Sequence, residues 1–420
     1  MCGMMPFHSE ILSMEKRALS IVTALGVMLM SSCGKTKVSS GGQPEKEAEV
    51  VTARVGDWSY TRSDAAMTGV ADTKLALPLQ LAWQFKTVEQ LKGKQEMMLA
   101  SAVVRNGKVY VGNKEGSFFC LELTTGKKLW EKTAPKGGFE GAAGFSGENV
   151  IAGCTDSFVY AWNAETGMPA WKFETEGDVH AAVNVWADPA GKQERIYIGS
   201  YDNKLYCLDP KDGKKLWEVE TGNYINGGSP ITADGKLVFG GCDAVLRVHD
   251  AVTGKEIKQI EVGSQIANNP AIADGVAYFG HYGNRVEAYS LNDGAKLWEY
   301  GEREFEFYAA PAIFEKMIVI GGRDKRMHGI DRVTGKKLWE LKCRDRIDSS
   351  AVICGGTHAV FGCDDGYLYV VEIATGKNVW ESQIGAPIKT SPAVAGDWII
   401  VGADDAVVYA FNNGGTRKQL

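Results

Sequence analysis

One short phrase recurs along the chain and limits what it can fold into. Its plainest copy runs from Leu205 to Trp217, with an alternating strand, a turn at Gly213 and a second strand that holds the tryptophan. Successive copies lie 40 to 47 residues apart. A unit of this size cannot bury its own apolar face, so neighbouring units must stack. A period near 40 with strand signals is typical of propeller blades.

Tryptophan occupies the second strand of the phrase in seven of its eight copies, and we place Ile257 at that position in the remaining copy, after Thr253-Gly254. A large aromatic side chain at the outer edge can pack one blade against the next. We therefore assign a blade-docking role to Trp83, Trp130, Trp171, Trp217, Trp298, Trp339 and Trp380.

Each repeat predicts four antiparallel strands, which we name A, nearest the axis, to D, at the outer edge. In the seventh repeat the pattern predicts strand A over 347–353, B over 359–362, C over 367–372 and D over 379–382. Glycine in the connecting turns supplies the positive φ that tight hairpins require. The eight C strands centre on Phe119, Tyr160, Tyr206, Val248, Ala288, Gly329, Tyr369 and Tyr409.

The two ends of the repeat region complement each other. The last C strand, around Tyr409, has no D strand after it, while the D strand around Trp83 comes first and has no turn before it. We expect this N-terminal strand to complete the last blade, which closes the ring and removes its open edges. The sequence thus predicts an all-β, eight-bladed β-propeller over residues 57–420.

The N-terminus has the pattern of an export signal. Lys16 and Arg17 precede an apolar run of 13 residues, and Ser31-Ser32-Cys33 follows it. Thirteen apolar residues are too few to span a bilayer. We interpret 1–33 as a lipoprotein-type signal with lipidation at Cys33, and an ordinary cleaved signal is the alternative. Either Met1 or Met14 can be the true start.

Residues 34–56 are rich in Gly, Ser and charged side chains, which predicts a flexible tether. Gly34 follows the cysteine where an aspartate would indicate retention at the inner membrane. We therefore expect the protein at the periplasmic face of the outer membrane, with a soluble periplasmic or extracellular location as the alternative. The net charge of −6 argues against a nucleic-acid partner, which usually needs a basic face.

Seven cysteines lie beyond Cys33, an odd number that cannot all pair within one chain. Cys154, Cys242 and Cys363 recur at one blade position, so they should lie far apart around the ring. We predict buried free thiols and no disulfide framework. The sequence contains no Cys/His cluster of metal-ligand spacing. Asp364-Asp365 and Asp404-Asp405 fall in B–C turns, where aspartate is favoured for backbone reasons, so we expect no metal there.

The pattern Leu-Tyr-x-Leu-Asp-x-x-Thr-Gly-Lys-x-x-Trp, over residues 81–412, resembles the repeat of pyrroloquinoline-quinone-type propellers. Asp57-Trp58-Ser59-Tyr60-x-Arg62 resembles the Asp-Trp lead-in that precedes such propellers. Together with the lipoprotein signal, the pattern is most similar to the BamB family. That resemblance implies a monomeric, non-enzymatic envelope scaffold, held to the membrane by its lipid, whose partner is a protein such as the outer-membrane barrel BamA.

The repeat marks a fold and leaves two other functions open. Quinone-dependent dehydrogenases of this fold have a vicinal Cys-Cys pair, a Ca²⁺ site and long inserts that roof the pocket. This sequence has no Cys-Cys dipeptide, and its blades leave almost no length for inserts. We therefore disfavour bound pyrroloquinoline quinone, expect no cofactor and assign no catalytic residue. A carbohydrate- or peptide-binding sensor is the third possibility.

The A strands contain one position at which every blade differs. It lies just before two small residues that the crowded axis requires. This position could face solvent and vary freely, but its chemical variety also suits a rim that recognises a protein or peptide. With the aromatic and Arg-rich neighbours in repeats six and seven, the predicted partner-binding rim consists of Glu140, His180, Asn226, Phe307, Tyr308, Arg346, Asp348 and Lys389.

Overall fold

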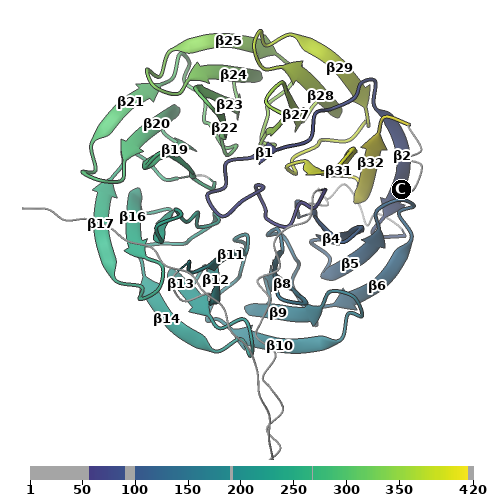
Figure 1. Cartoon of the computed structure of the whole chain (residues 1–420), viewed down its shortest axis with the longest axis vertical. Helices are drawn as coiled ribbons and strands as arrows, with labels where there is room; N and C mark the ends of the chain where they lie inside the picture. The colour runs from purple at the N-terminus through teal and green to yellow at the C-terminus, as the bar shows by residue number, and fades with distance from the viewer. Residues whose placement is uncertain (1–55, 90–99, 190–192, 267, 415–420) are drawn as a thin grey trace, which may run out of the picture. The chain divides into compact units, whose positions relative to one another are not determined.

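A computed structural model describes residues 56–89, 100–189, 193–266 and 268–414. The predicted signal sequence, Cys33 and all of the tether except Gly56 lie outside these ranges. The secondary structure within them consists of strands arranged as eight sheets around one axis (Figure 1). A membrane-spanning helix is not found among the described residues.

The strands follow the order of the repeats. Blades one and two comprise β3 (Val103–Arg105), β4 (Lys108–Gly112), β5 (Ser117–Glu122), β6 (Lys128–Thr133), β7 (Gly144–Ser146), β8 (Asn149–Cys154), β9 (Phe158–Asn163) and β10 (Pro169–Glu174). Blades three and four comprise β11 (Asn184–Ala187), β12 (Glu194–Gly199), β13 (Lys204–Leu208), β14 (Lys215–Glu220), β15 (Lys236–Gly240), β16 (Val245–Asp250) and β17 (Glu256–Glu261).

The second half of the ring continues the pattern. Blades five and six comprise β18 (Ala271–Ala273), β19 (Val276–His281), β20 (Arg285–Ser290), β21 (Lys296–Tyr300), β22 (Ala312–Phe314), β23 (Met317–Gly322), β24 (Arg326–Asp331) and β25 (Lys337–Lys342). Blades seven and eight comprise β1 (Val70–Ala71), β26 (Val352–Cys354), β27 (His358–Gly362), β28 (Tyr367–Glu372), β29 (Asn378–Gln383), β30 (Ala393–Ala395), β31 (Trp398–Ala403), β32 (Val407–Asn412) and β2 (Gln80–Lys86).

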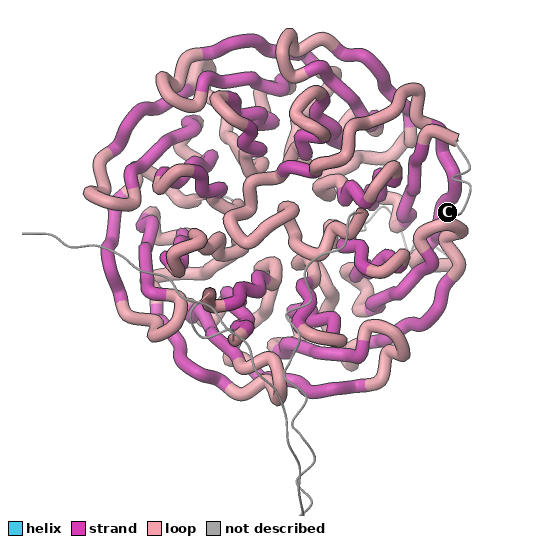
Figure 2. The backbone as a smooth tube through the Cα atoms, viewed as in Figure 1, coloured by secondary structure: helices cyan, strands magenta, loops and turns pink. Residues whose placement is uncertain are grey.

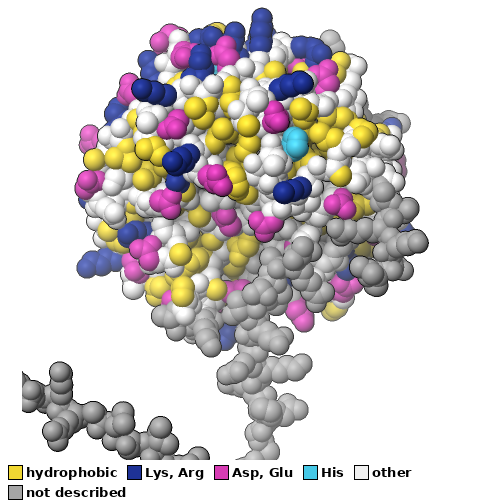
Figure 3. Space-filling view, turned by 45° about the horizontal axis from the view of Figure 1, so that its top comes forward, with side chains coloured by type: hydrophobic (Ala, Val, Ile, Leu, Met, Phe, Trp, Pro, Cys, Tyr) yellow, Lys and Arg dark blue, Asp and Glu magenta, His cyan; other side chains and the backbone are white. Residues whose placement is uncertain are grey.

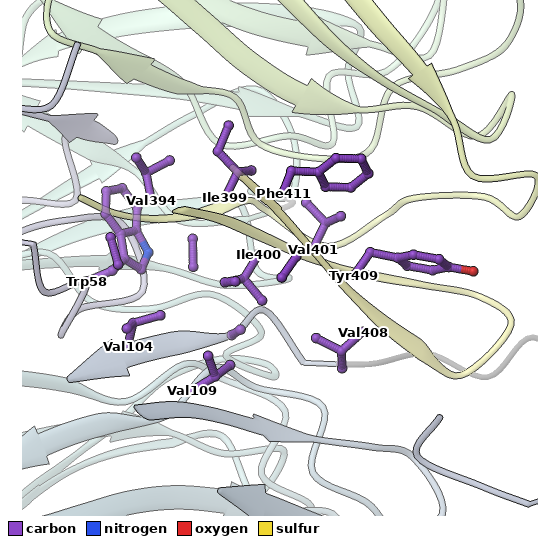
Figure 4. Packing of buried hydrophobic residues seen from close by; sticks show 14 of the residues in the cluster. Trp58, Val104, Val109, Val394, Ile399, Ile400, Val401, Val408, Tyr409 and Phe411 are labelled. Carbon is purple, nitrogen blue, oxygen red and sulfur yellow. The ribbon is translucent and has the colours of Figure 1, made fainter. Parts of the chain in front are cut away.

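The ring closes as the sequence predicts. Strand β2 pairs antiparallel with β32 and places Trp83 opposite Ala410, so the first strand completes the last blade (Figure 1). Figure 4 shows the apolar core at this junction, where Trp58 and Val104 from the start of the chain pack with strands of blade eight. The closure joins the two ends of the repeat region in one buried cluster.

Inner strands are shorter than predicted. In blade seven β26 begins at Val352, whereas the pattern predicted strand A from 347. The preceding hydroxyls bond to neighbouring blades instead: the Ser349 hydroxyl donates to the Thr390 carbonyl at 2.8 Å, and the Ser350 hydroxyl accepts from the Ala310 N–H at 2.9 Å. The small residues at the axis therefore connect blades as well as avoiding collisions.

Blade four has three strands, and its predicted inner strand is reduced to a bridge between Ile231 and Leu237. The Thr232 hydroxyl accepts the Lys236 N–H at 2.8 Å. A side chain that takes up a backbone donor in this way competes with the strand ladder. This local bond accounts for the shortened strand.

Six of the tryptophans dock one blade onto the next at the outer edge. The Trp339 indole N–H donates to the Ile373 carbonyl at 2.6 Å, and Trp83, Trp130, Trp171, Trp217 and Trp298 make the equivalent bond. The ring of each also covers a turn glycine of the next blade. At Gly126, whose φ is +70°, an added Cβ would lie 2.6 Å from the Trp83 ring, so only glycine fits.

The assignment of Ile257 to the tryptophan position is wrong by one residue. Val248 pairs with Lys258, just as Cys207 pairs with Trp217. Ile257 is 50% exposed, and the nearest atoms to the Gly294 turn belong to Lys258 and Ile260. The contact between blades four and five therefore lacks the indole that the preceding and following contacts use.

Residues 56–72, here called the strap, cross the ring before the first full blade (Figure 2). Their backbone carbonyls accept hydrogen bonds from blade after blade: Trp58 from Val104, Ala65 from Ile231, Ala66 from Ile272, Thr68 from Ile313 and Gly69 from Ile353, at 2.7 to 3.0 Å. The strap ends in β1, which pairs parallel with β26. Of this segment, the sequence indicates only the lead-in motif from Asp57 to Arg62, not its path across the ring.

Arg62 anchors the strap at the axis. Its side chain is 1% exposed and donates to the carbonyls of Ala351 at 2.8 Å and Pro311 at 3.0 Å. Burial lowers the pKa of this guanidinium to about 10, which leaves it charged at neutral pH. A buried cation thus links the inner strands of blades six and seven.

The seven cysteines among the described residues are free, as predicted. Six are buried, and Cys242 is partly exposed. Burial raises the pKa of the Cys120, Cys154 and Cys207 thiols to about 12, so they stay protonated and behave as small apolar side chains.

Candidate functional site

A cavity of about 510 Å³ lies at the axial end of the blades, on the side of the D–A and B–C turns. We call it the axial cavity. Thr61 of the strap is part of its lining, together with residues from the inner strands and turns of the blades. The strap bonds to the far ends of the inner strands, so it crosses the axis beneath this cavity.

Seven of the eight rim residues that the sequence predicts line the axial cavity: Glu140, His180, Asn226, Tyr308, Arg346, Asp348 and Lys389. Phe307 does not. Its side chain is 4% exposed and packs with Tyr300 and His328 inside the ring. Adjacent residues of an extended chain point in opposite directions, so Tyr308 faces the cavity and Phe307 faces the core.

A second set of lining residues, not predicted from the sequence, comes from the B–C turns. Each lies two positions after a glycine at or next to the end of strand B, as Tyr201 follows Gly199. The other members of this set are Tyr282, Arg323 and Asp404. The recurring glycine could have pointed to these turns, although the same offset on the other four blades reaches residues outside the lining.

Tyrosines form one part of the lining. The Tyr201 ring lies between His180, with ring centroids 4.2 Å apart, and Tyr224, stacked at 4.7 Å. Tyr282 meets Tyr308 edge to face at 6.2 Å. Burial raises the pKa of Tyr201 to about 12, so the phenol is neutral at physiological pH. Tyr224 is 46% and Tyr282 is 36% exposed, which leaves aromatic surface open at the mouth.

Ion pairs form the other part. Arg323 binds Asp348 through two nitrogens, at 2.9 and 3.0 Å, and its guanidinium lies 4.7 Å from the centre of the Tyr308 ring. Arg346 Nε lies 2.6 Å from Asp364 and 3.8 Å from Asp348. Lys389 and Asp404 of blade eight form a further ion pair in this part of the lining.

Lys389 Nζ lies 2.6 Å from Asp404 Oδ2. Burial raises the pKa of Asp364 above its usual range, while Arg346 opposes the shift. Glu140 behaves differently, because its hydrogen bond to His180 Nδ1, at 3.0 Å, lowers its pKa. The cations of the cavity are therefore already matched with carboxylates.

The two Asp-Asp dipeptides divide their roles. Asp365 and Asp405 accept backbone N–H groups within their own turns and also the hydroxyls of Tyr369 and Tyr409. Their preceding aspartates pair with the cations at the cavity. Among the described residues no group of three or more His, Cys, Asp or Glu could hold a metal ion.

The lining is a poor match for pyrroloquinoline quinone, which carries three carboxylates. The cations Arg323, Arg346 and Lys389 each already bind an aspartate, so the ligand would have to displace carboxylates that are nearly buried. Leaving a buried charge without its partner is costly. No chemical step through this cofactor follows from the site.

Comparison with known proteins matches nearly the whole propeller. The sequence profile of a family described as "Outer membrane protein assembly factor BamB" matches residues 80–224, 202–351 and 323–418. The Nitrosomonas eutropha protein of that name is 22% identical over 307 residues, which cover 67% of this chain and 68% of the relative. The Yersinia pestis protein is 23% identical and is covered over 53% of its length.

Dehydrogenases share the repeat. A quinohemoprotein alcohol dehydrogenase of Pseudomonas putida, ADH-IIG, is 31% identical over 116 residues, but these are 24% of this chain and 16% of the enzyme. Among solved structures, BamB from Moraxella catarrhalis superposes with a TM-score of 0.66 at 16% identity, over 82% of this chain and 100% of that one. Quinohemoprotein alcohol dehydrogenase from Comamonas testosteroni gives 0.72 at 14%, over 88% and 82%. At these identities the structures establish the shared fold alone.

Proposed function

The chain belongs to the family of outer membrane protein assembly factor BamB, and we propose that it is a non-enzymatic envelope scaffold that offers the rim of its axial cavity to a protein partner. The Nitrosomonas eutropha relative, aligned over 67% of this chain, carries the assembly-factor name. Under this proposal a partner such as a BamA-like barrel docks on the D–A and B–C turns.

The observation that carries the proposal is the chemistry of the rim at blades six and seven. Phe305 is 49% exposed, and the side chains of Arg344 and Arg346 are 55% and 43% exposed. Aromatic and arginine side chains are the usual anchors of protein interfaces. Arg344 also lies 4.1 Å from the centre of the Tyr367 ring, so it is held in place before any partner arrives.

The proposal includes export and a lipid anchor at Cys33, because the signal pattern ends there. Cell fractionation tests this part: the native chain should sediment with outer membranes, and Cys33→Ala should release it into the soluble periplasmic fraction. Equal membrane association of both proteins would contradict the anchor.

Affinity capture from detergent-solubilised membranes tests the scaffold role. The native chain should retain an outer-membrane barrel protein, and the double variant Arg346→Ala, Asp348→Ala should retain at least tenfold less. Lys336→Ala, in a turn at the opposite end of blade six, is the matched control and should capture normally. Equal capture by all three proteins, or capture of no barrel protein, would overturn the proposal.

The similarity to quinohemoprotein dehydrogenases makes an enzyme the second candidate. We propose that no quinone binds, because every cation of the cavity is already paired with an aspartate. Titration of the purified chain with pyrroloquinoline quinone and Ca²⁺ should leave the quinone absorbance unchanged. A saturable absorbance change with alcohol-dependent dye reduction would establish the enzyme instead.

A further inference from the structure

The axial cavity is polar almost throughout. Apart from Gly141, Ala142 and Ala182, every residue in its lining carries a polar group. Pockets for apolar ligands and most cofactors are lined mainly by hydrophobic side chains. An apolar ligand here would remove water from many polar groups without replacing their hydrogen bonds. The lining therefore selects a ligand that is itself rich in hydrogen-bonding groups.

The cations of the lining are already paired. Arg323 pairs with Asp348, Arg346 with Asp364 just outside the lining, and Lys389 with Asp404, while Glu140 bonds to His180. Each cation lies within 3.0 Å of a carboxylate oxygen. A charged ligand would bring an uncompensated charge into this partly desolvated site, which is unfavourable. A neutral ligand keeps every pair intact.

Neutral groups supply the remaining contacts. Asn226 and Asn268 contribute amides, and Tyr201, Tyr282 and Tyr308 contribute phenols, so the wall can both donate and accept hydrogen bonds. The Tyr201 ring is held between His180 and Tyr224, which positions its hydroxyl before a ligand binds. Such preorganisation reduces the entropy lost on binding.

The mouth adds aromatic surface to this polar wall. Tyr282 lines the cavity and is 36% exposed, while its edge-to-face contact with Tyr308 fixes its orientation. The electron-rich face of an aromatic ring attracts C–H groups that carry a partial positive charge. A pyranose ring presents such C–H groups on its faces and hydroxyls around its perimeter, which matches a polar wall beside an aromatic platform.

We propose that the axial cavity binds a neutral oligosaccharide, with one sugar ring packed on Tyr282 and its hydroxyls bonded to the amides, phenols and ion pairs of the wall. The volume of about 510 Å³ lies within the usual range for small-ligand pockets. This activity is additional to the protein scaffold. Arg346 and Asp348 belong both to the cavity lining and to the predicted partner-binding rim, whereas the exposed anchors Phe305 and Arg344 are not part of the lining.

Saturation-transfer NMR on the purified full chain tests the inference. The probes are maltotriose, cellotriose and triacetylchitotriose, and the charged comparators are trigalacturonate and protonated chitotriose. At least one neutral trisaccharide should show saturation transfer and a titratable Kd, and both charged sugars should bind at least tenfold more weakly. No transfer to any neutral probe, or stronger binding of a charged sugar, would overturn the proposal.

Variants locate the site. Tyr282→Ala should weaken binding at least tenfold, and Tyr308→Phe, which removes one hydroxyl and keeps the ring, should weaken it severalfold. Tyr367→Ala is the matched control, because Tyr367 is outside the cavity lining, and should bind like the native chain. Thermal melts of each variant show that it is folded.

Unchanged affinity in Tyr282→Ala would contradict the assignment. So would binding of the neutral peptide Gly-Ser-Gly-Ser at the same affinity as the trisaccharides, because the cavity would then recognise peptide groups in general. Protein capture is measured separately with Arg344→Ala, a rim variant outside the cavity lining that should bind the trisaccharide normally, so failure of the scaffold and failure of saccharide binding are distinguishable.

Discussion

At the outer edge, Trp339 and its counterparts repeat one contact from blade to blade, whereas at the axial mouth the blades contribute different side chains. The residues at the outer edge stabilise the ring, and one arrangement, an indole packed on a turn glycine, is used repeatedly there. Positions at the mouth, such as His180 and Lys389, face a cavity and are free to diverge. The difference indicates that the repeated residues determine the fold of the ring, and that the positions at which the blades differ determine what the mouth recognises.

The surface between these regions carries little information about function. On the face visible in Figure 3, positively and negatively charged side chains are interspersed with apolar ones. Clustered basic charge is the usual mark of a nucleic-acid site. This face gives no sign of a nucleic-acid site, whereas the axial cavity brings a specific set of polar side chains together.

The largest effect should come from removing an indole at the edge. Trp339 is 8% exposed and bonds to the next blade, so Trp339→Ala should lower the free energy of unfolding by about 3–5 kcal/mol. Leu338→Ala, at a neighbouring side chain that is 50% exposed, should cost under about 0.5 kcal/mol. Urea denaturation measures both. Similar losses for the two variants would mean that the indole does not dock the blades.

The strap should matter nearly as much, although it lies outside the repeat. Arg62→Ala leaves the carbonyls of Ala351 and Pro311 buried without their donor, which should cost about 2–4 kcal/mol. Arg62→Lys should lose less, because it retains the charge and a donor. Denaturation curves for both variants decide the point. A native-like midpoint for Arg62→Ala would show that the strap does not stabilise the ring.

The irregular contact between blades four and five allows the opposite change. Lys258→Trp restores the indole that the other contacts use and should raise the free energy of unfolding by about 1 kcal/mol. Ile257→Trp, one residue away on the exposed side, should give no gain. Thermal melts of the two variants compare them directly. A higher melting temperature for Ile257→Trp but not for Lys258→Trp would contradict the placement of Lys258 at the tryptophan position.

The smallest effect concerns acid stability at the mouth. The hydrogen bond with His180 lowers the pKa of Glu140, so the folded value lies below the unfolded value of 4.5. The resulting stability is present above pH 4.5 and is lost as pH falls through the folded pKa. The excess stability of the native chain over Glu140→Gln should therefore shrink by under about 1 kcal/mol between pH 6 and pH 3. An excess that grows on acidification would contradict the shift.

Sequence alone predicts the repeating part of the molecule well and the irregular part incompletely. Tryptophan and glycine at fixed spacing gave the blades and the closure by β2, because one contact is used repeatedly. The misplacement of Ile257 arose from following apolar character where the offset from Gly254 leads to Lys258. Counting four residues from the turn glycine identifies the tryptophan position better than apolar character does.

Other features depend on contacts that have no sequence period. The strap bonds to the blades through backbone carbonyls, which any residue supplies, so its lead-in motif did not predict that it crosses the ring. Phe307 and Tyr308 are adjacent aromatics, and only the direction of the chain decides which one faces the cavity. Tyr282 and Arg323 lie at a predictable offset, but their meeting with Tyr308 and Asp348 depends on the folded turns.

Photo-crosslinking in intact cells tests the central claim, that recognition lies at the mouth and not at the turns of the opposite face. Benzoylphenylalanine would replace Phe305 or Arg344 at the rim and, in separate strains, Lys214 or Lys336 in the opposite turns. The account predicts a crosslinked envelope protein from the rim positions and none from the turns. Crosslinks from Lys214 and Lys336 alone would place the partner on the opposite face and contradict the account.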